Sequence, residues 1–290
     1  MFKGSMVALV TPFNQEKIDE EKIKNLVNFH LENKTDGIVP CGTTGESPTL
    51  SFEEHERVIE IVVQAVNKKI PVIAGTGGNN TKEAITLTKF AKKIGCDGAL
   101  IVVPYYNKPT QKGLYEHYKK IAEEVDIPII LYNIPGRTGI NMIPETVAKL
   151  SQIKNIVGIK EASGSISQVA EVISICPKNF VVFSGDDNMT LPLLALGGKG
   201  VISVVANIIP QEIHDMIENW EKGNIQKAQE IFYKFLPLCN SMFFETNPIP
   251  VKTAMFLMKK ISDEIRLPLC KMETENITKL ENVLKKYNLI

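Results

Sequence analysis

Residues 127–133 read IPIILYN, a run of apolar residues that no charged side chain interrupts. Such a run suits a parallel strand covered on both faces, because a strand with one wet face would alternate apolar and polar residues. Runs of the same character occur along the chain as SMVALV (5–10), GIVPCG (37–42), IPVIAGTG (70–77), GALIVVP (98–104), IVGIK (156–160), FVVFSG (180–185) and GVISVV (200–205). The run starts fall about 28 residues apart, close to the length of one strand–helix unit.

The segments between these runs carry helix signals. Ser51 and Glu54 have the spacing of a capping box, and Thr81 begins a helix that Gly95 ends. Pro144 suits the first turn of a third helix. Eight strand–helix units predict an α/β fold, a (β/α)8 TIM barrel. The alternative is an open doubly wound sheet, but a dinucleotide-binding sheet of that kind would favour GxGxxG after the first strand, where TPFNQE stands.

The strand signals disappear after about residue 222, and the remaining segments indicate helices. We therefore predict a barrel over residues 1–222 that carries the active site and a C-terminal α-helical domain over residues 223–290. No low-complexity linker separates the two.

Composition excludes several classes of protein. The chain has 33 basic and 33 acidic residues, so no net field favours nucleic acid or an anionic membrane. Five widely spaced cysteines without a CxxC pair are typical of reduced cytosolic thiols. Four histidines form no HxH or HExxH pair, which argues against a zinc site built on local spacing. No apolar stretch is long enough for a signal peptide core or a spanning helix, so we expect a cytoplasmic protein.

Lys160 ends the apolar run IVGIK, although lysine is among the residues least often buried. An amine nucleophile must be neutral, and burial lowers the pKa of a lysine, so this position suits an attack on a carbonyl. Tyr132 ends the preceding run, and a phenol beside a Schiff base can move protons. The alternative is a strand-end lysine paired with Glu161. Successive strand residues face opposite ways, which argues against that pair.

Other strand ends carry polar residues on the same predicted rim. GTTGE (42–46) can present N–H groups and hydroxyls to a carboxylate or phosphate, although the motif alone slightly favours a tight loop with polar filler. Arg137 suits a carboxylate or is a solvated loop charge. The pair Asp186-Asp187 favours a helix N-terminus over a metal site, and Cys41 favours a buried small residue over a nucleophile.

Four motifs together resemble one known family: GTTGES (42–47), YNIPGRTG (132–139), GIKEASG (158–164) and FSGDD (183–187). They are similar to motifs of the pyruvate-dependent class I aldolases, which include N-acetylneuraminate lyase. The resemblance extends over nearly the whole chain, including NPIPVK at 247–252. It implies a lyase that condenses pyruvate with L-aspartate 4-semialdehyde to 4-hydroxy-tetrahydrodipicolinate, the first step of the diaminopimelate and lysine branch. Cleavage of N-acetylneuraminate or a 2-keto-3-deoxy sugar acid is the alternative, and that activity has less use for Arg137.

The resemblance also implies roles for single residues. Lys160 matches the Schiff-base lysine, and Tyr132 the proton-relaying tyrosine. Thr43 matches the threonine that links Tyr132 to a second tyrosine, Tyr106, which enters the site of a neighbouring subunit. The implied binding residues are Thr44 for the pyruvate carboxylate, Arg137 for the semialdehyde carboxylate, and Gly185 and Ile202 for the pocket wall. No metal or organic cofactor is implied, because the covalent imine on Lys160 is the electron sink.

Regulation and assembly are implied less directly. Positions that match a lysine-binding regulatory site are Ser47, His55, Asn79, Glu83 and Tyr105, whereas Phe52 and Pro48 depart from the lysine-sensitive pattern. A role for Tyr106 in a neighbouring site implies at least a homodimer, and the family pattern implies a homotetramer. Two other classes stay open: a non-catalytic small-molecule binder, and a metal-dependent barrel aldolase.

Overall fold

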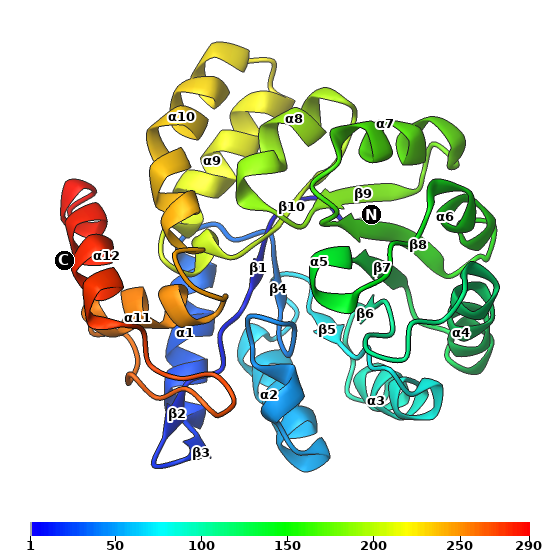
Figure 1. Ribbon diagram of the computed structural model, residues 1–290, viewed down its shortest axis with the longest axis horizontal. Coiled ribbons are helices and arrows are strands. Elements are labelled where there is room, and N and C mark those ends of the chain that lie inside the picture. The colour runs from blue at the N-terminus through cyan, green and yellow to red at the C-terminus, as the bar shows by residue number, and fades with distance from the viewer. Residues whose placement is uncertain (1) are drawn as a thin grey trace. The chain divides into compact units, whose positions relative to one another are not determined.

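The computed structural model describes residues 2–290 (Figure 1). These residues divide into two compact units. Unit 1 contains the N-terminal residues up to Gly4 and the segment Pro71–Ile202. Unit 2 contains Ser5–Ile70 and Ser203–Ile290. Within residues 2–290, no helix is both long and apolar enough to cross a membrane.

Unit 1 is a regular alternation of strands and helices. Its strands are β5 (Ile73–Gly75), β6 (Gly98–Val102), β7 (Ile129–Asn133), β8 (Ile156–Glu161), β9 (Val181–Ser184) and β10 (Gly200–Ser203, whose last residue is in unit 2). They pair in parallel in the order β10-β9-β8-β7-β6-β5. The helices are α3 (Thr81–Lys93), α4 (Gln111–Glu124), α5 (Pro135–Thr138), α6 (Pro144–Leu150), α7 (Ile166–Ile175), the 3-10 helix η2 (Asp187–Met189) and α8 (Thr190–Ala195).

Unit 2 combines two parallel strands with the C-terminal helices. Its strands are β1 (Gly4–Ala8, whose first residue is in unit 1), β4 (Gly37–Val39) and the hairpin β2 (Phe13–Asn14) and β3 (Lys17–Ile18). β1 pairs in parallel with β4. Its helices are α1 (Glu20–Glu32), η1 (Ser47–Thr49), α2 (Phe52–Val66), η3 (Val205–Asn207), α9 (Pro210–Glu221), α10 (Ile225–Ser241), α11 (Ile249–Leu257) and α12 (Thr274–Lys286).

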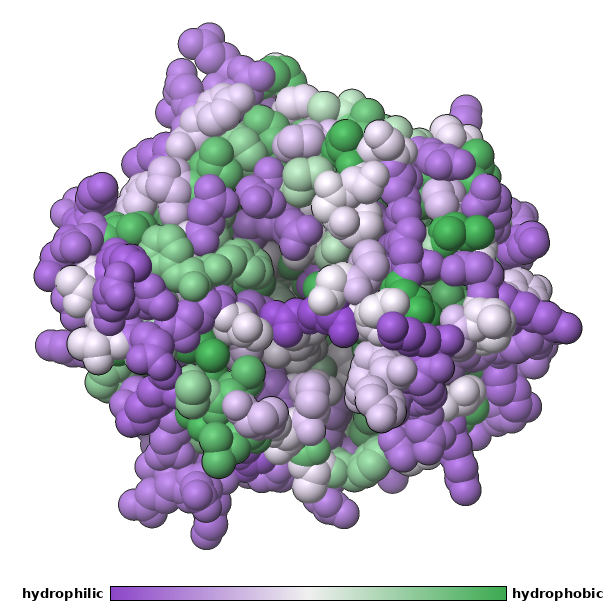
Figure 2. Space-filling model, in the orientation of Figure 1, coloured by the Kyte–Doolittle hydropathy of each residue, from purple (hydrophilic) through white to green (hydrophobic). Residues whose placement is uncertain are grey.

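Each predicted apolar run contains a parallel strand, and the reason is burial on both faces. All five residues of β7 are buried, as are all four of β9. Helices of unit 1 cover the strands from outside, and Figure 2 shows hydrophilic side chains along the outer edge formed by α3, α4, α6 and α7. The apolar strands therefore form the core, and the charged helix faces meet water.

The predicted helix boundaries are also confirmed. Ser51 Oγ accepts the Glu54 amide at 3.2 Å while the Glu54 carboxylate accepts the Ser51 amide at 3.0 Å, which completes the capping box of α2. α3 begins at Thr81 and is followed by Gly95 with a φ of +89°, a left-handed conformation that glycine adopts easily. Pro144 occupies the first turn of α6.

Candidate active site

Lys160 and Tyr132 form the centre of the candidate site in unit 1. The register of β7 and β8 pairs Tyr132 with Lys160, so the two side chains share one face of the sheet. Both residues are only 5% exposed. Lys160 Nζ lies 4.4 Å from the centre of the Tyr132 ring. A buried amine beside a phenol can form an imine and exchange protons with its neighbour.

Glu161 lies on the other face of β8, as the alternation predicted. Its carboxylate accepts hydrogen bonds from Asn133, Gln168 and Ser163. Among the ion pairs that residues 2–290 form, none joins Glu161 to Lys160. The interpretation of Lys160 as one half of a strand-end ion pair is therefore wrong.

Gly185 follows β9 and approaches β8 closely. Its amide donates to the Glu161 carbonyl at 2.8 Å, and a Cβ atom at this position would lie 2.4 Å from the Ala162 Cβ. Only glycine fits without displacing the chain beside Lys160. Ile202, on β10, is fully buried.

Asp186 is a residue that the sequence did not single out as part of the site. It precedes η2, in agreement with the interpretation of Asp186-Asp187 as a helix N-terminal pair. Burial raises the pKa of Asp186 above its ordinary value, and the charge of Lys160 opposes this only in part. A buried carboxyl with a raised pKa beside an amine is a typical feature of functional sites, so Asp186 is a further candidate site residue.

Arg137 lies on α5, a single turn that follows β7 directly (Figure 1). Pro135 occupies the first turn of α5, and the Arg137 amide donates to the Ile134 carbonyl at 3.0 Å. The Arg137 side chain is exposed. An exposed guanidinium on a fixed turn, five residues after Tyr132, suits the carboxylate of an entering substrate.

Thr43 and Thr44 belong to unit 2, where they form the turn of GTTGE. The Gly45 amide donates to the Gly42 carbonyl at 3.1 Å, and the Glu46 amide donates to the Thr43 carbonyl at 3.1 Å. Thr43 is half-buried and Thr44 is buried. Asn247 Nδ2 donates to the Thr44 hydroxyl at 3.0 Å. The motif NPIPVK, which begins at Asn247, therefore supports this turn. The sequence identified NPIPVK as part of the family resemblance but did not predict this contact.

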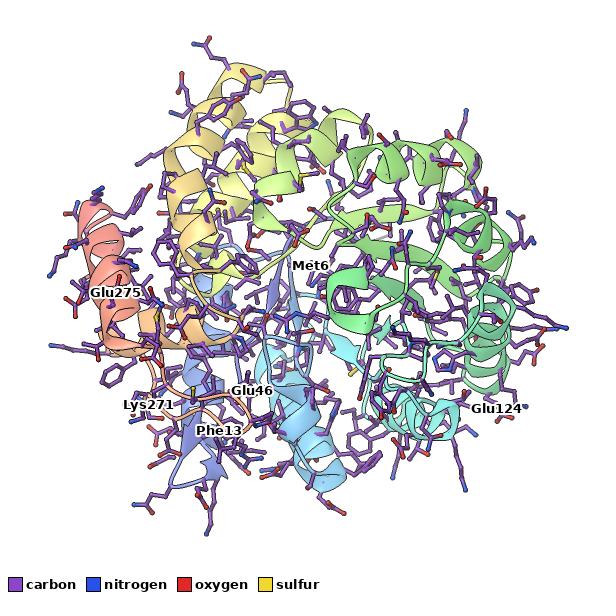
Figure 3. All side chains as sticks on the ribbon, viewed as in Figure 1. Met6, Phe13, Glu46, Glu124, Lys271 and Glu275 are labelled. Carbon is purple, nitrogen blue, oxygen red and sulfur yellow. The ribbon has the colours of Figure 1, made fainter. Side chains whose placement is uncertain are left out.

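A buried ion pair holds the end of the same turn in unit 2. Lys252 Nζ lies 2.5 Å from Glu46 Oε1, and Glu46 Oε2 accepts the Arg266 amide at 3.0 Å. Lys252 Nζ also lies 4.5 Å from the centre of the Phe13 ring. Both Glu46 and Phe13 are labelled in Figure 3. Sequence reasoning missed the pair, because its two residues are 206 positions apart.

The residues predicted for regulation fall in both units. In unit 1, Asn107 Nδ2 donates to the Asn79 carbonyl at 2.9 Å, and Glu83 accepts from Asn80 at 2.9 Å. Tyr105 is 36% exposed, and its neighbour Tyr106 is 90% exposed with a φ of +72°. In unit 2, His55 is buried on α2, and Ser47 begins η1.

One histidine cluster could hold a metal ion. In the described part of the chain, the side chains of His214, Asp215 and Glu218 on α9 place their ligand atoms within 4.8 Å of one another. His214 already lies 3.0 Å from Asp36, and lysines pair with the two carboxylates: Lys34 with Asp215 and Lys222 with Glu218. These ion pairs explain the cluster without a metal.

Known proteins resemble this chain over its whole length. The model of the dihydrodipicolinate synthetase family matches residues 1–287. The 4-hydroxy-tetrahydrodipicolinate synthase of Syntrophus aciditrophicus is 58% identical over 290 residues, which are 100% of both proteins. The crystal structure of dihydrodipicolinate synthase from Aquifex aeolicus is 54% identical, with a TM-score of 0.98 over 99% of both chains. A structure of DHDPS from Cyanidioschyzon merolae with lysine bound is 43% identical, with a TM-score of 0.97 over 100% of this chain and 99% of that one.

This likeness confirms the predicted fold, a TIM barrel of parallel strands and helices with additional C-terminal helices. It also confirms the resemblance inferred from the four sequence motifs. The chain belongs to the dihydrodipicolinate synthetase family.

Proposed function

We propose that this chain catalyses the reaction for which its relatives are named, the synthesis of 4-hydroxy-tetrahydrodipicolinate from pyruvate and L-aspartate 4-semialdehyde in lysine biosynthesis. The observation that carries the proposal is the buried Lys160, whose Nζ lies 4.4 Å from the centre of the Tyr132 ring. Relatives with this activity match the chain from end to end.

The reaction begins when the Lys160 amine attacks the pyruvate ketone and releases water to form an imine. Loss of a methyl proton then gives an enamine, with Tyr132 moving protons at the lysine nitrogen. The enamine carbon attacks the aldehyde of the semialdehyde and forms the new carbon–carbon bond. The amine of the semialdehyde finally displaces Lys160, which closes the ring and regenerates the free lysine.

The remaining residues bind and orient the substrates. The resemblance to the family assigns Thr44 to the pyruvate carboxylate and Thr43 to the proton relay with the two tyrosines, and we propose these roles for the turn of GTTGE. Arg137 receives the carboxylate of the semialdehyde, a role that its exposed position on α5 supports. Gly185 and Ile202 are proposed for the pocket wall, and the approach of Gly185 to Ala162 supports a place beside the end of β8, the strand that carries Lys160.

Borohydride trapping with pyruvate, followed by peptide mass mapping, tests the proposal. We expect a pyruvyl adduct on the peptide that carries Lys160, its loss in Lys160→Ala, and its retention in the surface control Lys154→Ala. No adduct on the folded protein would end the Schiff-base proposal. Turnover is then measured with aspartate semialdehyde and, in parallel, with N-acetylneuraminate, and faster cleavage of the sugar acid would favour the lyase alternative.

The exposure of Tyr106 supports an assembly. A tyrosine that is 90% exposed in the single chain is available to enter the site of a neighbouring subunit, so at least a homodimer is proposed, with a homotetramer as its further association.

The barrel boundary at residue 222 and the cytoplasmic location also stay predictions.

Lysine is proposed as an inhibitor that binds the residues Ser47, His55, Asn79, Glu83 and Tyr105. The lysine-bound DHDPS of Cyanidioschyzon merolae supports this proposal, while Phe52 and Pro48 depart from the sensitive pattern. A titration of activity with lysine tests it, and a flat response up to millimolar lysine would exclude the regulation.

A further inference from the structure

Glu161 is a buried carboxylate whose hydrogen-bond donors are all uncharged. It is only 4% exposed and directly follows Lys160. Its Oε1 accepts the Ser163 amide at 2.7 Å, and its Oε2 accepts Gln168 Nε2 at 3.1 Å. Asn133 Nδ2 lies 3.3 Å from Oε1 and 3.1 Å from Oε2. A buried carboxylate needs its oxygens satisfied in this way, because burial without donors is costly.

Asn133 connects this carboxylate to the segment that carries Arg137. Asn133 is fully buried at the end of β7, and its register partner on β8 is Glu161. Its Oδ1 accepts the Met142 amide at 3.0 Å, and its Nδ2 also donates to Asn141 Oδ1 at 2.7 Å. The chain leaves β7 at Asn133 and returns to the same side chain at Met142. Segment 134–142, with Arg137 in it, is therefore closed at its base by one amide.

Gln168, on α7, completes the network from the helix side. Its Nε2 donates to Asn141 Oδ1 at 3.1 Å as well as to Glu161, and its Oε1 accepts Asn141 Nδ2 at 2.7 Å. Four side chains thus form a closed ring of hydrogen bonds: Glu161, Asn133, Asn141 and Gln168. All of them lie within unit 1.

We propose that Glu161 is a positioning residue that sets the place of Arg137 and so determines the affinity for the second substrate. Its carboxylate fixes the Asn133 amide, and the Asn133 amide fixes both ends of segment 134–142. The inference rests on the proposed function of Lys160 and Arg137. Glu161 touches neither substrate, since its side chain lies on the face of β8 opposite to Lys160.

The chemistry requires a carboxylate at this position. A carboxylate accepts from every side, whereas the side-chain amide that Glu161→Gln introduces would turn an NH2 group toward at least one donor among Ser163, Asn133 and Gln168. Where the new NH2 group faces another N–H donor, the hydrogen bond between the two positions is lost and a buried donor is left unsatisfied. The ring would reorganise, and segment 134–142 would lose its fixed base.

The first test is Glu161→Gln, with Glu171→Gln, an exposed residue on α7, as the matched control. We expect Glu161→Gln to raise the KM for aspartate semialdehyde roughly tenfold, the factor that one lost buried hydrogen bond accounts for. The rate of borohydride trapping with pyruvate should stay within about threefold of the wild type, because the Lys160 face is unchanged. Gln168→Met, which removes a donor at a half-buried position, should shift the same KM and serves if Glu161→Gln fails to fold.

A second test asks whether the effect passes through Arg137. In an Arg137→Ala background, Glu161→Gln should add less than about twofold to the KM for the semialdehyde, because the group that it positions is already absent. The proposal is overturned if folded Glu161→Gln and Gln168→Met keep the wild-type KM, if trapping slows by the same factor as turnover, or if the two substitutions act independently. Failure of the proposed function itself would show differently, as a wild-type protein that forms no adduct with pyruvate.

Discussion

The buried pair of Glu46 and Lys252 gives the sharpest prediction about stability. The Lys252 side chain is 3% exposed and the Glu46 side chain 0% exposed, so neither charge is hydrated. Replacing Lys252 with methionine keeps most of the apolar stem but removes the ammonium group. The Glu46 carboxylate would then retain one described donor in unit 2, the Arg266 amide at 3.0 Å.

The expected loss follows from the charge that remains buried. Removing one partner of a buried pair typically destabilises a protein by about 3–5 kcal/mol. The contact of Lys252 with the Phe13 ring at 4.5 Å adds to that loss by about 0.5–1 kcal/mol. Burial lowers the pKa of Lys252, which shows that the ammonium group is itself held at a desolvation cost. The double variant, with neither charge, should therefore lose much less than the two single losses combined.

Urea unfolding of a double-mutant cycle measures this, with Lys252→Met, Glu46→Gln and the combination of both. Glu46→Gln should lose about 3–5 kcal/mol of unfolding free energy, Lys252→Met should lose slightly more because of the Phe13 contact, and the double variant should lose less than their sum. Lys279→Met is the matched control, because it breaks an exposed pair with Glu275 and should cost less than about 1 kcal/mol. Single losses below about 1 kcal/mol, or losses that simply add, would refute the reasoning.

Three further predictions concern packing, pH and assembly. Gly185→Ala should lose about 1–3 kcal/mol in urea unfolding, because the new Cβ lies 2.4 Å from the Ala162 Cβ, and an unchanged midpoint would contradict this. Burial lowers the pKa of His117 from 6.5 to about 4, so the unfolded chain binds the extra proton and the stability from this group is lost as pH falls from 6.5 to about 4. His117→Gln should flatten that part of the pH dependence of unfolding by up to roughly 3 kcal/mol, and an identical slope would exclude the histidine as its source. Mixing inactive Tyr106→Phe with inactive Lys160→Ala should restore activity through mixed oligomers, whereas no recovery after subunit exchange would argue against a shared site.

The strands were predictable because their signal is local. β7 is apolar at nearly every position, since helices cover it outside and side chains fill its other face. The hairpin of β2 and β3 was missed, because two-residue strands with Asn14 and Lys17 in them carry no periodic pattern. Capping residues such as Ser51 were predictable for the same reason as the strands, because Ser51 and Glu54 are close in sequence.

The candidate site was predictable only in part. Lys160 and Tyr132 stand out because a polar residue ends an apolar run, and the resemblance to a family assigned their roles. The hydrogen bonds that hold the site residues in place depend on strand register and on contacts between residues far apart in the sequence, and no local sequence pattern predicts these. Asn133 and Glu161 meet across 28 positions because β7 and β8 pair in one register. From the sequence, Glu161 was a possible ion-pair partner for Lys160. Only the structure shows that its side chain instead binds Asn133, at the base of segment 134–142.

Because segment 134–142 closes on Asn133, the proposed binding of the second substrate at Arg137 and the proposed imine formation at Lys160 depend on different parts of the barrel. Segment 134–142 leaves β7 at Asn133, and its last residue, Met142, donates back to the Asn133 side chain. The residues between, apart from Asn141 of the hydrogen-bond ring, can therefore change without shifting the register of β7 and β8. A change confined to residues 134–140 would thus alter the part proposed to select the aldehyde and leave Lys160 and Tyr132 in place. On the proposed mechanism, the formation of the imine and the choice of the acceptor aldehyde are therefore carried by separate parts of the barrel.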